Sequence, residues 1–256
     1  MKLLVWNDGR VVEAAMFRLD KPYIMQRIHT LGYKPYNVAR HVALLREETM
    51  RVFGFASLCS AADAERIITK LLELSRVSRQ LSCPVAMRVD ACGALSFEVE
   101  KPLYVGGISL RAKRFTGVDI VMNAPETLCQ SSVSVAVDAM VDAVVEKRGG
   151  DMPVWTDADG SVISLPWRPL FAVFNGKVYT PCQYDTVEYI SVVEAIKRLN
   201  LELTVRTIPV ESLQRMDELF VADVMSVLSF STINKHRLLS VVTSRIADKM
   251  EPKSTI

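Results

Sequence analysis

The sequence predicts a two-domain α+β protein. Its 256 residues are enough for one large domain or two ordinary ones. Half of the residues are hydrophobic and 23% are charged, which excludes a disordered chain and a small disulfide-rich scaffold. Helical and strand-like segments follow one another without the strict alternation of a Rossmann fold. We place an N-terminal α/β domain at 1–115, a linker at 116–125 and a C-terminal α+β domain at 126–256.

The N-terminal domain begins with a predicted β-hairpin over residues 3–12, turning at Asn7-Asp8-Gly9. Apolar residues at helical spacing predict a helix over 39–52. A second helix starts after Ser60, which with Asp63 forms a capping box, and its apolar face extends to Leu81. Two strands, 84–89 and 95–99, are joined by a turn at 90–93. This domain therefore combines a meandering sheet with two helices.

The C-terminal domain follows a predicted linker. Phe115-Thr116-Gly117 and Ala124-Pro125 contain the residues that interrupt regular secondary structure there. A helix is expected over 127–147. It is apolar around most of its circumference, which predicts burial at a subunit contact, and it stops at Gly149. We then expect strands at 154–156, 162–164, 170–174 and 177–179, a helix at 186–199, strands at 202–208 and 217–224, and a helix at 237–250.

Apolar runs are too short for a membrane span, and the N-terminus has no signal-peptide core, so we expect a cytoplasmic protein.

The charge distribution excludes some partners and leaves others open. A formal net charge of +2 gives no case for nucleic acid as a partner. Residues 1–115 hold 18 Lys/Arg and 11 Asp/Glu (+7), whereas 116–256 hold 13 and 18 (−5). The basic half either binds an anionic ligand or an acidic partner, or is simply a solvated surface.

Common catalytic and metal-binding motifs are absent from the sequence. The five cysteines form no C-x-x-C pair, and the three histidines have no metal-ligand spacing, so no metal site is expected. There is no G-x-S-x-G, P-loop or G-x-G-x-x-G motif. The turn Asp157-Ala158-Asp159-Gly160 begins like a calcium loop, but Arg168 stands where the loop needs a glutamate. A plain hairpin turn is the better interpretation.

Several segments resemble the class IV aminotransferase family, which includes branched-chain aminotransferase, D-amino-acid aminotransferase and aminodeoxychorismate lyase. The similar segments cover roughly residues 125–240 and include KRGGD at 147–151, DADGSV at 157–162, LFAV at 170–173 and GKVYTP at 176–181. In the N-terminal half, HVALL at 41–45 is more faintly similar to the family's H-x-x-R-L. The resemblance implies a D-amino-acid aminotransferase-like fold, a homodimer, and pyridoxal phosphate held between the domains.

The cofactor chemistry of that family needs three kinds of residue. A lysine forms the Schiff base, a carboxylate faces the pyridine nitrogen, and an arginine with backbone N–H groups holds the phosphate. Ungapped counting places Ser131 at the lysine position and Ser164 at the carboxylate position, and Leu44 falls at the arginine position. A hydroxyl group cannot form an imine, so transamination through Ser131 is excluded.

Both expected phosphate turns also depart from the family. The first, Tyr189-Ile190-Ser191, lacks the family's glycine, and the second, Ala222-Asp223-Val224-Met225, carries an aspartate that would repel a phosphate. We therefore expect no catalytic residue of the family type and no bound cofactor. The candidates for lining the remaining cleft are Leu44, Ser131, Ser164, Ile190, Ser191 and Val224.

These departures favour a non-catalytic relative: a homodimer, a ligand-binding protein or the partner subunit of another protein, with a small anionic ligand as one option. The alternative is an active pyridoxal-phosphate aminotransferase or lyase whose motifs have diverged. A third hypothesis is a cofactor-free enzyme that uses Ser131, Ser132, Cys129 or Arg168, but no base is visibly paired with any of them.

Overall fold

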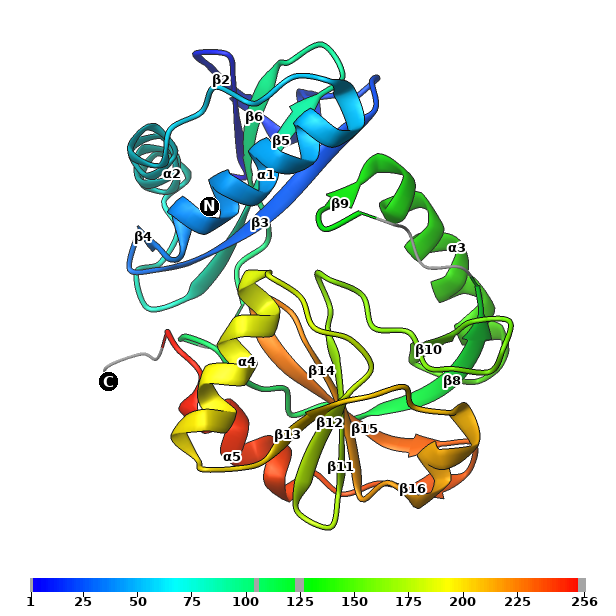
Figure 1. The fold of residues 1–256 in the computed structure, drawn as a ribbon. Helices are drawn as coiled ribbons and strands as arrows, with labels where there is room; N and C mark the ends of the chain where they lie inside the picture. Colours follow the sequence, from blue (N-terminus) through cyan, green and yellow to red (C-terminus); the bar gives the residue numbers. More distant parts are fainter. Residues whose placement is uncertain (1, 104–105, 123–126, 253–256) are drawn as a thin grey trace. The chain divides into compact units, whose positions relative to one another are not determined.

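The computed structural model describes residues 2–103, 106–122 and 127–252. The chain divides into two compact units (Figure 1). Unit 1 comprises Met1–Gly107, Thr127–Val133 and Pro252–Ile256, and unit 2 comprises Ile108–Glu126 and Ser134–Glu251. Among the described residues, no helix is long and apolar enough to cross a bilayer.

Unit 1 is built on an antiparallel sheet with the strand order β2-β1-β6-β5-β3-β4, and β9 pairs with β3. Strand β5 alternates: Val85, Met87 and Val89 enter the hydrophobic core, so Arg88 and Asp90 face the other side of the sheet. The strands are β1 (Leu4–Asn7), β2 (Arg10–Glu13), β3 (Tyr23–Leu31), β4 (Lys34–Pro35), β5 (Ser82–Asp90), β6 (Leu95–Val99) and β9 (Gln130–Ser131).

Two helices cover the apolar face of this sheet. Helix α1 (Val38–Phe53) packs on β3, and α2 (Ala61–Ser75) packs on β1 and β6. The predicted cap of α2 is confirmed, because the Ser60 hydroxyl accepts a hydrogen bond from the Asp63 N–H at 3.1 Å. The helix ends at Arg76, whose φ of 53° is left-handed, so Leu81 does not belong to it as we expected. A short 3-10 helix, Ala14–Met16, follows β2.

Unit 2 is built on a mixed sheet with the strand order β10-β8-β15-β14-β11-β12-β13, and β7 and β16 both pair with β15. The strands are β7 (Ser109–Leu110), β8 (Phe115–Val121), β10 (Met152–Thr156), β11 (Leu170–Phe174), β12 (Lys177–Thr180), β13 (Leu203–Val205), β14 (Glu218–Ala222), β15 (Ser226–Ile233) and β16 (His236–Arg237).

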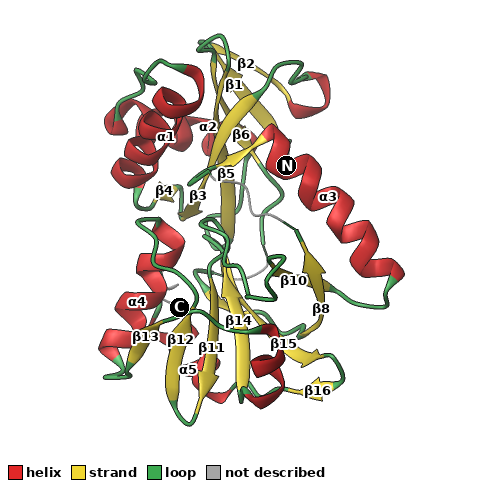
Figure 2. Cartoon of the chain, turned by 45° about the vertical axis from the view of Figure 1, so that its right-hand side comes forward, coloured by secondary structure: helices red, strands yellow, loops and turns green. Residues whose placement is uncertain are grey.

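Helices α4 (Val187–Arg198) and α5 (Val241–Lys249) lie side by side on this sheet (Figures 1 and 2). Their residues Ile196 and Ile246 share a core with Phe171 and Phe220, whose rings stack at 5.2 Å. Helix α3 (Ser132–Lys147) packs Val141 and Val145 against Trp155. A short 3-10 helix, Val210–Arg215, precedes β14.

The structure differs from the sequence-based expectation around the linker. Strand β8 occupies Phe115–Val121, and residues 123–126 lie outside the described residues. Gly117, which we interpreted as a linker residue, is the point at which the backbone closely approaches the Phe230 ring. A Cβ at this position would lie 2.9 Å from that ring. Helix α3 begins at Ser132 instead of 127, and residues 162–164 form no strand beyond isolated bridges at Val162 and Ser161.

A buried carboxylate holds the start of α5. Glu218 is 2% exposed and accepts hydrogen bonds from the N–H groups of Val242 (2.8 Å) and Thr243 (2.7 Å) and from the Thr243 hydroxyl (2.7 Å). The N-cap residue Ser240 makes no side-chain cap bond, so Glu218 takes over that role.

Replacing Glu218 with alanine should lower the free energy of unfolding by roughly 2–3 kcal/mol, because buried donors lose a charged acceptor. Urea denaturation monitored by circular dichroism measures this loss. Glu194→Ala, at an exposed position on α4, is the matched control and should change stability little. An equal effect of the two substitutions would contradict the capping role.

Candidate functional site

The segment that carries Ser131 is joined to the sheet of unit 1. Strand β9 pairs with β3 in the register Ile24↔Ser131 and Met25↔Gln130. Ser131 is 9% exposed, and the Ser132 hydroxyl accepts a hydrogen bond from the Tyr23 N–H at 3.4 Å. The position at which the resemblance expects a Schiff-base lysine is therefore a nearly buried serine on a paired strand.

A buried polar relay lies beside this segment. The Gln26 amide donates to the Cys129 sulfur at 2.9 Å, and its carbonyl oxygen lies 2.7 Å from Nδ1 of His41. Burial lowers the pKa of His41 to about 3, with Arg40 adding to the effect, so the ring is neutral and Nδ1 carries the donated proton. The Cys129 thiol in turn lies 3.6 Å from the Leu44 carbonyl oxygen. The relay fixes the segment that holds Ser131.

Leu44 itself belongs to the hydrophobic core. Its side chain is 4% exposed and packs within the core of unit 1. Only its backbone carbonyl takes part in the relay. We expected Leu44 as a cleft residue at the position of the family's phosphate arginine, but an apolar core side chain offers nothing to a phosphate.

In unit 2, Ser164 organises a loop. The residue is 2% exposed, and its hydroxyl accepts a hydrogen bond from the Leu170 N–H at 2.9 Å. Its carbonyl oxygen accepts from the Tyr184 hydroxyl at 2.6 Å, and burial raises the pKa of Tyr184. Ser164 therefore connects the loop to the start of β11.

The N-terminus of α4 lies two residues before the phosphate turn that we expected. Thr186 is the N-cap, the Ile190 N–H already donates to the Thr186 carbonyl at 3.0 Å, and the Ser191 hydroxyl donates to the Val187 carbonyl at 2.7 Å. Ile190 and Ser191 are thus part of the regular helix. The N–H groups that a helix leaves free belong to residues 187–189.

Glu188 occupies this helix N-terminus. The residue is 6% exposed, and burial raises the pKa of its carboxyl to about 8. Its own backbone N–H opposes that rise, whereas the negative charge of Asp223 adds to it. A helix N-terminus attracts an anion, but below about pH 8 the buried Glu188 carboxyl places a neutral group there.

In the second expected phosphate turn, the Asp223 side chain bonds the backbone of the turn itself. One carboxylate oxygen accepts hydrogen bonds from the N–H groups of Met225 (2.8 Å) and Ser226 (2.7 Å) and from the Ser226 hydroxyl (3.2 Å). Val224, at the tip of this turn, is 6% exposed. The Met225 and Ser226 donors that this turn could offer to a bound anion are therefore already bonded to Asp223.

These residues do not fit pyridoxal phosphate as the resemblance implies it. Both turns expected to hold the phosphate contain a carboxyl group. The negative charge of Asp223 opposes a bound anion, and the buried carboxyl of Glu188, which is neutral below its pKa of about 8, lies at the other turn. Every lysine within the described ranges is exposed, whereas the position of the Schiff base is Ser131. We therefore derive no chemical step through this cofactor.

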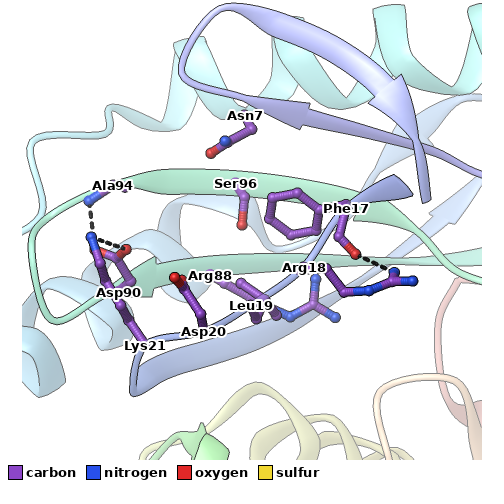
Figure 3. A pocket seen from close by; sticks show the side chains of 10 residues that line it. All are labelled: Asn7, Phe17, Arg18, Leu19, Asp20, Lys21, Arg88, Asp90, Ala94 and Ser96. Atoms are coloured by element: carbon purple, nitrogen blue, oxygen red, sulfur yellow. Dashed lines mark hydrogen bonds and ion pairs between the residues drawn. The ribbon is translucent and has the colours of Figure 1, made fainter. Parts of the chain in front are cut away.

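A polar pocket that the sequence did not reveal lies on the open face of the unit 1 sheet (Figure 3). The register places Asn7, Ser96 and Arg88 side by side on three adjacent strands. The pocket has a volume of about 200 Å³, and Arg18, Lys21, Asp20 and Asp90 also line it.

Arg88 forms the floor of this pocket. Its side chain is 9% exposed, and its guanidinium pairs with Glu98 at 2.6 Å and Glu100 at 3.9 Å. Among the described residues, its Nε has no hydrogen-bond partner. An arginine inside the otherwise apolar segment Pro84–Val89 was the available sequence signal, but we interpreted that segment only as a strand.

Metal binding finds no support within the described ranges, where no group of three or more His, Cys, Asp or Glu side chains gathers. The turn at Asp157 is a plain turn as predicted: its carboxylate accepts from the N–H groups of Asp159 (3.0 Å) and Ser161 (2.7 Å). All five cysteines are free thiols.

No protein-family model matches the chain, and no curated protein matches it in sequence. Solved structures do match. An aminotransferase from Brucella abortus bound to pyridoxal phosphate superposes with a TM-score of 0.81 at 15% identity, covering 97% of this chain and 98% of that one. The branched-chain aminotransferase of Escherichia coli gives 0.80 at 15% identity, with 100% and 98% covered. That of Thermoproteus uzoniensis with norvaline gives 0.79 at 15%, with 97% and 93% covered.

This likeness confirms the fold that the resemblance implied. It covers both units and nearly the whole of each matched chain. The chain has the two-unit α+β fold of the class IV aminotransferases.

Proposed function

We propose that this chain is a class IV aminotransferase-like protein that does not carry out pyridoxal-phosphate catalysis and acts as a non-catalytic subunit or ligand-binding protein. The observation that supports this most strongly is the pair of carboxyl groups, Glu188 and Asp223, in the two turns that would have to hold a phosphate. Ser131 at the lysine position supports it further. The alternative, an active aminotransferase or lyase with diverged motifs, rests on the fold.

A cofactor-free enzyme is less well supported. Cys129 is fully buried and bonded within the Gln26–His41 relay, so its sulfur is not placed for attack on a substrate. Ser132 accepts a bond from a backbone N–H, and no general base is paired with its hydroxyl in the described structure.

The ligand we propose is a small anion bound in the Arg88 pocket. Three cations, Arg18, Lys21 and Arg88, line it against two carboxylates, and Asp90 already bonds the N–H groups of Cys92 (2.8 Å) and Ala94 (2.9 Å). Lys21 is paired with Asp90 at 3.9 Å, and Arg88 is paired with Glu98 and Glu100. The donors that suit a carboxylate or phosphate are therefore the Arg88 Nε and Arg18, which makes no ion pair with a described residue. We propose neither a nucleic-acid nor a membrane partner.

We also propose a cytoplasmic homodimer. Free thiols suit a reducing compartment. Helix α3 carries an exposed apolar face in which Met140 is 69% and Val144 is 42% exposed, with exposed Ala136 and Ala143 beside them. Small residues flanking larger apolar ones allow close approach of a second helix, and this face is where we place a second copy of the chain.

Pyridoxal phosphate should not remain on the protein. After incubation with excess cofactor and dialysis, we expect a colourless protein, and borohydride should trap no phosphopyridoxyl-lysine detectable by mass spectrometry. A yellow protein whose colour is fixed on one lysine by borohydride would overturn the non-catalytic proposal.

Glu188 should make stability depend on pH. Its folded pKa, about 8, lies above the ordinary value of 4.5, so the carboxyl stabilises the fold fully below pH 4.5 and loses that contribution as pH rises towards 8. Glu188→Gln should therefore become progressively more stable than the wild type across this window, by at most about 1.4 kcal/mol per pH unit.

Urea denaturation at several pH values measures this difference. Glu194→Gln, at an exposed position on the same helix, is the control and should follow the wild type at every pH. A Glu188→Gln difference that does not change with pH would show that the carboxyl is not buried as described.

The α3 face should decide the oligomeric state. Size-exclusion chromatography with light scattering should give twice the chain mass for the wild type and the chain mass for Met140→Glu/Val144→Glu, because buried unpaired charges oppose association. Asp142→Asn, exposed on another side of the helix, should remain dimeric. A monomeric wild type, or a dimer unaffected by the double substitution, would refute the interface.

A further inference from the structure

An apolar groove runs along α2 on the helix-covered side of unit 1, away from the Arg88 pocket. Two cavities of about 550 and 310 Å³ adjoin there, and both are bounded by Trp6, Arg66 and Ile67. Along the helix, the lining residues extend from Asp63 to Leu74. At 1.5 Å per residue, this is a length of about 16 Å, which is three turns of an α-helix.

The rim of the groove displays large apolar side chains. Leu58 is 95% exposed at one end, Leu74 is 46% exposed at the other, and Val11 of the β1–β2 hairpin is 43% exposed. Isolated apolar residues on a surface are ordinary, but these stand around two cavities that share three lining residues. Such a patch marks an interaction surface.

The loop that presents Leu58 is held on both sides. The Arg46 guanidinium donates to the carbonyl oxygens of Ser57 (3.2 Å) and Cys59 (3.5 Å). The Ser57 N–H donates to the Thr49 hydroxyl at 3.2 Å. Ser57 and Cys59 are each 7% exposed. Leu58 is therefore displayed by an ordered backbone, and a partner would lose little affinity in ordering it.

The groove is basic. Arg66 and Lys70 line it, whereas Asp63 is its one carboxylate among the described lining residues. Both cations make only exposed pairs, with Asp63 at 3.0 Å and with Glu73 at 3.8 Å, and such pairs are weak enough to be exchanged. Residues 1–107 also hold 15 Lys/Arg against 11 Asp/Glu, an excess of four positive charges.

We infer that this groove binds an amphipathic, acidic α-helix of a partner protein. Apolar residues at positions i, i+3 or i+4, and i+7 of the partner fill the two cavities, and its carboxylates meet Arg66 and Lys70. A polypeptide also covers Leu58 and Leu74, which a small molecule inside the cavities would leave in water. This inference does not depend on whether the chain binds pyridoxal phosphate.

Selection from a random peptide library tests the groove without a known partner. A phage-displayed library is selected on the full chain, with counter-selection on the bare support only. We expect enriched peptides with Leu, Phe or Trp at helical spacing and several Asp or Glu residues. The best peptide, labelled with fluorescein, is then measured by fluorescence polarisation against the wild type and the variants.

Binding should weaken at least tenfold for Leu58→Asp and for Arg66→Glu/Lys70→Glu, because the first removes an apolar contact and the second reverses the complementary charge. Leu239→Asp, an exposed leucine on unit 2, is the matched control and should bind like the wild type. All of these side chains are exposed, and unchanged urea denaturation confirms that the variants fold.

Three outcomes would overturn the inference. These are a selection without any enriched peptide, enriched peptides that are basic, and enriched peptides that bind Leu58→Asp as tightly as the wild type. Saturable binding of 1-anilinonaphthalene-8-sulfonate in the groove, without any selectable peptide, would assign the cavities to a small apolar molecule instead.

Discussion

Two carboxyl groups, those of Asp223 and Glu188, lie at the turns of unit 2 that the resemblance assigns to a phosphate. Asp223 accepts hydrogen bonds from the backbone of its own turn, and Glu188 lies buried at the N-terminus of α4, where helix N–H groups would otherwise be free. A helix terminus and a tight turn both bind anions well, and the Asp223 carboxylate already accepts the N–H groups of its turn. In our proposal, these two carboxyl groups occupy the positions at which the resemblance implies a phosphate.

In unit 1, the positions that the resemblance assigns to the cofactor are held in structural contacts. The segment Thr127–Val133 is fixed by β9 pairing and by the relay from His41 through Gln26 to Cys129. Leu44 packs in the core, and Ser131 is nearly buried on its strand. The polar pocket around Arg88 lies on the open face of the sheet. This distribution of charge is in keeping with our proposal that the chain binds a small anion.

Local signals predicted much of the fold. The Ser60 cap, the hairpin turn at Asn7-Asp8-Gly9 and the helix over 186–199 all depend on neighbouring residues, and the structure confirms them. Strand β3 was missed because Gln26, Arg27 and His29 interrupt its apolar pattern, yet these residues find partners across the sheet. Gly117 misled us because a glycine at a close approach to Phe230 looks the same in sequence as a linker glycine. The sequence placed Glu188 at the start of the helix over 186–199, but its burial is a tertiary property that local patterns do not predict.

The central claim is that the carboxyl groups of Glu188 and Asp223 exclude a phosphate from unit 2. Pyridoxamine 5′-phosphate tests it most directly, because this compound carries the same phosphate but cannot form an imine with an exposed lysine. Isothermal titration calorimetry at neutral pH should show no saturable binding to the wild-type chain. Saturable binding of one molecule per chain, lost when the α4 N-terminus is altered by Thr186→Pro, would contradict the account.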